Sequence, residues 1–83
     1  MNKKIAKKTI ILYVLKILSQ LSSEKHPVTQ SAIAEYLNDI GIPCDRKTVG
    51  RNIGYLIDFG YKIIKVEKKG FYLVKQIRSE NER

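Results

Sequence analysis

The sequence predicts a mainly α-helical domain with a small β-hairpin, arranged as a winged helix-turn-helix of three helices and a two-stranded wing. Two helical patterns are separated by a short turn with glycine and proline at 41–44, and a β pattern with a glycine-containing turn follows at 61–74. At 83 residues the chain can enclose only a single modest core. We therefore expect one domain over 1–83, with flexible ends at 1–7 and 77–83.

The first helix is expected from Thr9 to about Leu21. Its apolar side chains recur at helical spacing and cover one broad face, made of Ile10, Ile11, Val14, Leu15, Ile17, Leu18 and Leu21. Leu12 and Tyr13 fall outside this face, which leaves apolar surface for a homodimer contact through this helix. The polar segment that ends in Pro27 terminates the helix, because proline disfavours the α conformation in the residue before it.

The second helix is expected at 30–39, with Thr29 as its N-cap. Its inward-facing positions are Ile33, Leu37 and Ile40. Gly41 supplies the left-handed residue that follows many helices, and Pro43 prevents continuation. This short helix and its tight turn form the first half of the predicted helix-turn-helix.

The third helix is expected to start after the N-cap Asp45 and to run to about Phe59, where Gly60 closes it. Its two faces separate cleanly, with Val49, Ile53, Leu56 and Ile57 inward and Lys47, Thr48, Arg51, Tyr55 and Asp58 outward. Gly50 and Gly54 are unusual because each costs about 0.5–1 kcal/mol relative to alanine inside a helix. Close approach of DNA, close approach of a partner helix, a pliable helix and neutral drift all remain open explanations for them.

The wing is expected as a hairpin of 61–66 and 71–74 around the turn 67–70, because β-branched and aromatic residues flank a glycine-containing turn. Lysines dominate its tip. With three helices before it, this hairpin completes the order of elements of a winged helix.

The chain carries 16 Lys and Arg against 8 Asp and Glu, a formal net charge of +8, which favours a polyanionic partner. The positive charge lies mainly in 1–25 and 46–75, whereas 26–45 is acidic. Because the basic blocks include the third helix and the wing, double-stranded DNA is favoured over a membrane. The longest apolar run, Ile10 to Leu15, is far shorter than the roughly 20 residues that cross a bilayer.

The residue inventory argues against an enzyme. His26 is the only histidine and Cys44 the only cysteine, so we expect no catalytic residues, no metal site and no cofactor. A lone cysteine also forms no disulfide within the chain, which favours a cytoplasmic, nucleoid-associated protein.

The third helix carries the predicted base-reading residues, since the N-terminal part of a recognition helix reaches base edges in the major groove. These residues are Arg46, Lys47, Thr48, Arg51, Asn52 and Tyr55, with Arg51 and Thr48 ranked first. Arginine pairs with guanine, threonine makes a contact through its methyl or hydroxyl group, and asparagine reads adenine. The alternative interpretation is a helix face that is merely solvated.

Phosphate contacts are predicted at Thr29, Gln30 and Ser31, beside the free N–H groups of a helix start. Lys68 and Lys69 on the wing are expected to contact phosphates or to enter the adjacent minor groove. Two structural interpretations stay open. The polar residues can simply cap the helix, and lysines can simply protect a hairpin edge.

The run from Asp45 to Ile53, followed by Leu56, 60–63 and 70–73, resembles the N-terminal winged helix-turn-helix of bacterial WYL-domain and deoxyribose-operon-repressor-type transcriptional regulators. The resemblance covers about 8–75 and implies DNA binding by the third helix, through Arg46, Lys47, Thr48 and Arg51. This chain differs from that pattern in having asparagine after Arg51, where the family usually has aspartate, and in having two helical glycines.

We therefore expect a sequence-specific transcriptional regulator, either an excised DNA-binding module or a small stand-alone protein of bacterial or phage type. The alternative is a winged-helix protein-interaction module, such as a phage-encoded inhibitor of an acidic host protein. Membrane-surface association through the lysine-rich N-terminus is a weaker third hypothesis.

Overall fold

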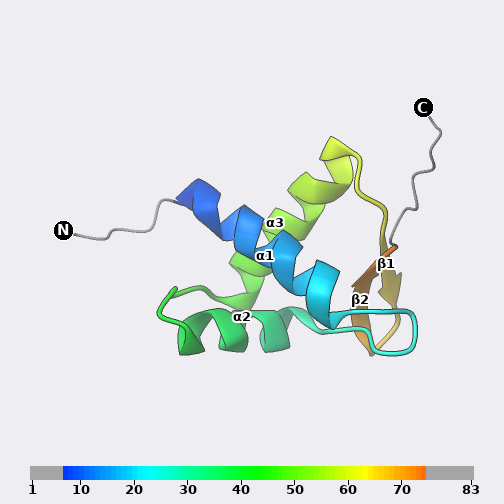
Figure 1. Ribbon diagram of the computed structural model, residues 1–83, viewed down its shortest axis with the longest axis horizontal. Helices are drawn as coiled ribbons and strands as arrows, with labels where there is room; N and C mark the ends of the chain where they lie inside the picture. Colours follow the sequence, from blue (N-terminus) through cyan, green and yellow to red (C-terminus); the bar gives the residue numbers. More distant parts are fainter. Residues whose placement is uncertain (1–6, 75–83) are drawn as a thin grey trace.

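The computed structural model describes residues 7–74, which form three helices and one hairpin (Figure 1). The elements are α1 (Lys7–Leu21), α2 (Gln30–Asp39), α3 (Arg46–Phe59), β1 (Ile63–Val66) and β2 (Gly70–Leu73). This order confirms the predicted fold class of three helices and a two-stranded antiparallel hairpin. Lys7, which was expected to be flexible, is the first residue of α1, and the rest of the expected flexible ends lies outside the described residues.

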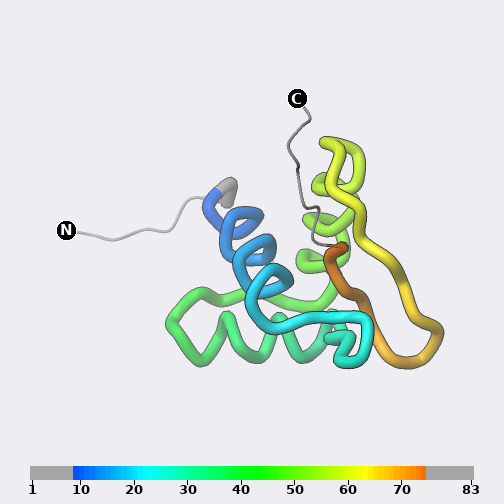
Figure 2. The backbone as a smooth tube through the Cα atoms, turned by 45° about the vertical axis from the view of Figure 1, so that its right-hand side comes forward, coloured from blue at the N-terminus to red at the C-terminus, as the bar shows by residue number. Residues whose placement is uncertain are grey.

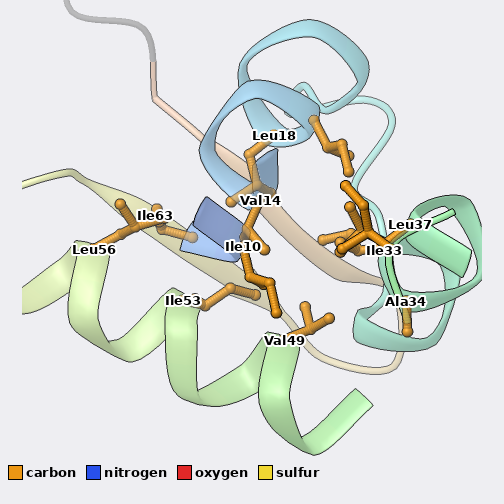
Figure 3. Packing of buried hydrophobic residues seen from close by; sticks show 12 residues of the cluster. Ile10, Val14, Leu18, Ile33, Ala34, Leu37, Val49, Ile53, Leu56 and Ile63 are labelled. Atoms are coloured by element: carbon orange, nitrogen blue, oxygen red, sulfur yellow. The ribbon is translucent and has the colours of Figure 1, made fainter. Parts of the chain in front are cut away.

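The core lies where α1, α2 and α3 pack against one another (Figure 3). Ile10, Val14 and Leu18 of α1 point into the same cluster as Ile33 of α2 and Ile53 of α3. Burying apolar surface is the main favourable term in folding. The remaining buried members of the cluster are Ile17, Ala34, Leu37, Ile42, Val49, Leu56 and Ile63.

Three side chains predicted to face inward are exposed, namely Leu21, Ile40 and Ile57. Leu21 and Ile40 lie at helix ends, where the core no longer covers them. Ile57 lies on the flank of α3. Tyr13, predicted to lie outside the core face, is half-buried and packs against the cluster. A side chain on the inward face of a helix is therefore buried only where another helix or strand lies opposite it.

The hairpin is shorter than predicted, and its register runs from Ile63 opposite Leu73 to Val66 opposite Gly70. Its turn is closed by a 2.9 Å hydrogen bond from the Lys69 N–H to the Val66 carbonyl. Lys68, the third residue of this turn, has a positive φ of 66°, a conformation that glycine or asparagine adopts more easily.

The loop between α1 and α2 runs beside the hairpin and pairs with it (Figures 1 and 2). Val28 donates to the Phe71 carbonyl at 2.9 Å and accepts from the Phe71 N–H at 2.7 Å. Gly70 lies so close to the Val28 carbonyl that a Cβ atom there would clash with it, and its φ is +125°. Glycine at this position therefore permits the close approach that holds the wing to the helical part of the fold.

The end of α1 is also fastened to the wing. The Ser22 hydroxyl donates to the Leu18 carbonyl at 2.6 Å and accepts from the Leu73 N–H at 3.1 Å. Ser22 is buried, and the two bonds satisfy its hydroxyl group. No helix within residues 7–74 has the length and apolar character needed to cross a membrane.

Candidate nucleic-acid interface

The angle between α2 and α3 is held by side chains in and beside the turn. Asn38, near the end of α2, donates through Nδ2 to the carbonyls of Ala34 and Cys44, both at 2.8 Å. Gly41, with φ +89°, turns the chain, and the buried Ile42 donates to the Leu37 carbonyl at 2.8 Å. Sequence reasoning missed Asn38, although an asparagine in the last turn of a helix is a recognised partner for free carbonyls.

The start of α3 is capped as predicted. Oδ1 of Asp45 accepts a 2.9 Å hydrogen bond from the Thr48 N–H. The hydrogen bonds from Thr48 lower the pKa of Asp45, and the nearby Arg51 guanidinium acts in the same direction. Burial, followed by the charge of Asp45, raises the pKa of the Cys44 thiol. Cys44 is thus kept in its protonated form, which is the unreactive one.

The first residues of α2 and α3 are joined directly. Nε2 of Gln30 donates to the Arg46 carbonyl at 2.9 Å. A Cβ atom at Gly50 would lie 2.5 Å from that same Nε2 atom. Gly50 is therefore explained by the packing of the Gln30 side chain on α3. At Gly54 nothing lies within 4 Å of the Cβ position, and nothing in the structure explains that glycine.

The outward face of α3 carries most of the residues that the sequence assigned to it. Arg46, Lys47, Arg51 and Tyr55 are exposed, and Thr48 is half-buried. Asn52 differs from its prediction as an adenine-reading residue. Its side chain is only 7% exposed, lies on the core side of the helix, and donates through Nδ2 to the Thr48 carbonyl at 2.8 Å. The prediction for Asn52 is therefore wrong, because its amide is turned inward and already bonded.

The starts of α2 and α3 meet the wing around a shallow groove of about 250 Å³. The groove is lined by Thr29, Gln30, Ser31, Arg46, Lys65, Val66, Lys68, Lys69, Gly70 and Phe71. All five residues predicted to contact phosphate line it, together with the first residue of α3. Sequence reasoning missed Lys65, which the alternation along β1 places on the exposed face of the strand.

Two of the residues predicted to contact phosphate also have structural roles. The Thr29 hydroxyl accepts a 3.0 Å hydrogen bond from the Ala32 N–H, so it caps α2. The Gln30 amide N–H donates to α3. Ser31 and the four cationic side chains of the groove are exposed. The side chain of Gln30, beside them, is half-buried. The groove lining contains four basic residues and no acidic one, so its electrostatic field favours an anion.

The chain matches no protein-family model, no curated protein and no solved structure. Within residues 7–74, no group of three or more His, Cys, Asp or Glu side chains is placed to hold a metal ion.

Proposed function

We propose that the chain binds double-stranded DNA in a sequence-specific manner and acts as a transcriptional regulator. The observation that carries the proposal is the basic groove, which brings the starts of α2 and α3 and the wing together at the end of α3 where Arg46 and Lys47 are exposed. A duplex offers two features that fit this arrangement, namely a groove that admits a helix and a phosphate backbone beside it.

In this proposal the N-terminal half of α3 enters the major groove. Arg51 and Arg46 donate paired hydrogen bonds to guanine edges, and Thr48 contacts a thymine methyl group or a base edge. Lys47 contacts phosphate. Arg51 lies one turn beyond Lys47 on the same face, so the two cations follow one line along the helix. Unpaired like charges at this spacing repel each other, and a bound polyanion relieves the repulsion.

The wing and the start of α2 contact the backbone that flanks the reading helix. Lys65, Lys68 and Lys69 supply charge to phosphates or to the adjacent minor groove, which adds affinity and salt dependence. The free N–H groups at the start of α2 supply uncharged donors to the same strand. Ser31, exposed beside them, adds a hydroxyl.

We further propose that two copies bind a two-fold symmetric site in the cytoplasm, in contact through α1. Leu12 is exposed on α1, and Ile11 and Leu15 beside it are only half-buried, so the helix presents an apolar strip. Two-fold dimers of helix-turn-helix proteins read half-sites about one helical turn apart.

The experiment that tests the function is selection of bound duplexes from a random pool by the full chain. Enrichment of a palindrome is the expected result, and it defines specificity and symmetry together. Absence of any enriched or retarded duplex at moderate salt, combined with a stable complex with an acidic protein, favours the protein-interaction module instead.

A further inference from the structure

We infer that Phe59 and Tyr61 form a stacking site for unpaired nucleobases at the C-terminal end of α3. This site rests on the proposed function, because the basic residues of the groove are what bring DNA to this helix. It adds a second site and a second class of ligand, which is single-stranded DNA next to the duplex.

The two rings stack on each other. Their centroids lie 6.1 Å apart, and their planes differ by 26°, so the rings are close to parallel. The end of α3 builds this arrangement. Gly60 has φ +127°, its N–H donates to the Leu56 carbonyl at 3.1 Å, and the Tyr61 N–H donates to the same carbonyl at 3.0 Å. This cap turns the chain back at once and places Tyr61 beside Phe59.

Packing does not account for Phe59. Phe59 is 82% exposed, the largest exposure among the large apolar side chains of the described chain. The core cluster is filled without it, since Leu56 covers that end of α3 and is buried. Tyr61, which stacks on Phe59, is 36% exposed, and neither ring belongs to the core cluster, so an aromatic surface remains open at this end of α3.

The position of the pair on α3 connects it to the proposed DNA contacts. Lys47, Arg51, Tyr55 and Phe59 follow one another four residues apart, and all four are exposed. Positions four apart form a ridge along a helix surface. The ridge is cationic in the half nearest the groove and aromatic in the other half.

The cationic and aromatic halves of this ridge lie well apart along the helix axis. Phe59 lies eight residues beyond Arg51, which is about 12 Å along the helix axis. The major groove is about 12 Å wide. When Arg51 contacts a base edge, the ring pair therefore lies at or past the far edge of the groove, where the flanking strand passes.

Nucleobases fit the chemistry of this surface better than an aliphatic partner does. The surface is built from flat aromatic rings, and every base has a flat face that stacks on such rings without regard to sequence. Lys62, exposed next to Tyr61, supplies a cation for the phosphate of a stacked nucleotide.

The test uses the full chain and three fluorescent DNA probes of matched sequence, namely a blunt duplex, the same duplex with a single-stranded overhang, and the overhang strand alone. Each contains 2-aminopurine, whose emission falls on stacking. The overhang is expected to raise affinity over the blunt duplex by about tenfold or more and to quench the probe. Phe59→Leu with Tyr61→Leu removes that increment and the quenching, and leaves blunt-duplex binding unchanged.

Ile57→Ala is the matched control, because Ile57 is an exposed apolar residue at the same end of α3 without a ring. It is expected to leave all three affinities unchanged. Equal binding of blunt and overhang duplexes by the wild-type chain overturns the inference, as does an equal loss on both in the leucine variant. Dissociation of a dimer by the leucine variant assigns the rings to a second copy and also overturns it. Ring-dependent binding of the single strand without blunt-duplex binding sustains this inference while the proposed function fails.

Discussion

The side-chain amide of Gln30 donates a 2.9 Å hydrogen bond to the main-chain carbonyl of Arg46, which joins the first residue of α2 to the first residue of α3. This bond fixes the distance between two helix starts that both line the basic groove. Gln30, which the sequence predicts to contact phosphate, thus also holds the starts of α2 and α3 in position.

Gln30→Ala is expected to lower the free energy of unfolding by about 1 kcal/mol, since a typical internal hydrogen bond contributes that much. Urea titration measures the change. Ser31→Ala is the matched control, because Ser31 is an exposed neighbour in the same helical turn. Equal stability of the two variants would contradict the role assigned to Gln30.

Gly54→Ala is expected to stabilise the chain by about 0.5–1 kcal/mol, because alanine is the better helix former and nothing lies within 4 Å of the new methyl group. Gly50→Ala is expected to gain less, since its methyl group displaces the Gln30 amide. In a Gln30→Ala background that opposing cost disappears, and Gly50→Ala should then stabilise as Gly54→Ala does. A double-mutant cycle measured by thermal unfolding reports the coupling, and additive effects of the two substitutions would refute it.

Arg51→Ala is expected to weaken binding to the selected duplex by about 1–3 kcal/mol and to relax the preference at one base pair. Competition with single-base variants of the duplex measures both effects. Lys16→Ala is the control, because it removes one positive charge from an exposed position on α1. A uniform loss over all base variants would place Arg51 on phosphate instead of on a base.

Lys68→Ala with Lys69→Ala is expected to weaken binding to all duplexes and to reduce the slope of log affinity against log salt by up to about two. Lys68→Gly adds a second readout. Because Lys68 has a φ of 66°, glycine should raise the stability of the fold while it lowers DNA affinity. Lys69→Gly, whose φ is not positive, should lower DNA affinity without that gain in stability. If Lys68→Gly is less stable than the wild-type chain, left-handed strain at this turn is excluded.

Asp45 is expected to make stability depend on pH in the acid range. Its pKa is lowered in the folded state by the hydrogen bonds from Thr48, so its contribution is fully present above the ordinary aspartate pKa and is lost as pH falls through the folded value. Asp45→Asn keeps a capping oxygen but cannot titrate. Urea titrations between pH 7 and pH 2.5 should show a steeper loss of stability for the wild-type chain than for the variant. Parallel curves would show that another group governs acid unfolding.

Helix positions and caps could be predicted from the sequence because they depend on local patterns. Thr29 and Asp45 both accept the N–H bond expected of an N-cap, at Ala32 and Thr48. Burial at helix ends could not be predicted, because it depends on what lies opposite. Ile40 is exposed, whereas Ile42, two residues later in the turn, is buried.

The direction in which side chains point within the interface also depends on tertiary contacts. Asn52 lies four residues after Thr48, close to the boundary between the two faces of α3, and only packing decides that it turns inward. Gly50 has no local explanation, because the Gln30 side chain that fills the space beside it comes from another helix. Most polar residues of the basic groove could be predicted from the sequence, since they carry charge or lie at a helix start. The contribution of Lys65 to the groove could not, because it depends on the hairpin register.

The pairing of Val28 with Phe71 has a consequence for the thermodynamics of recognition. Val28 immediately precedes Thr29, the cap of α2, so the wing and the start of α2 are tied by two main-chain bonds. Docking onto a ligand then orders no free hairpin, and the association forfeits little conformational entropy. The spacing between the contacts made by the wing and those made by α2 is therefore fixed before the ligand binds.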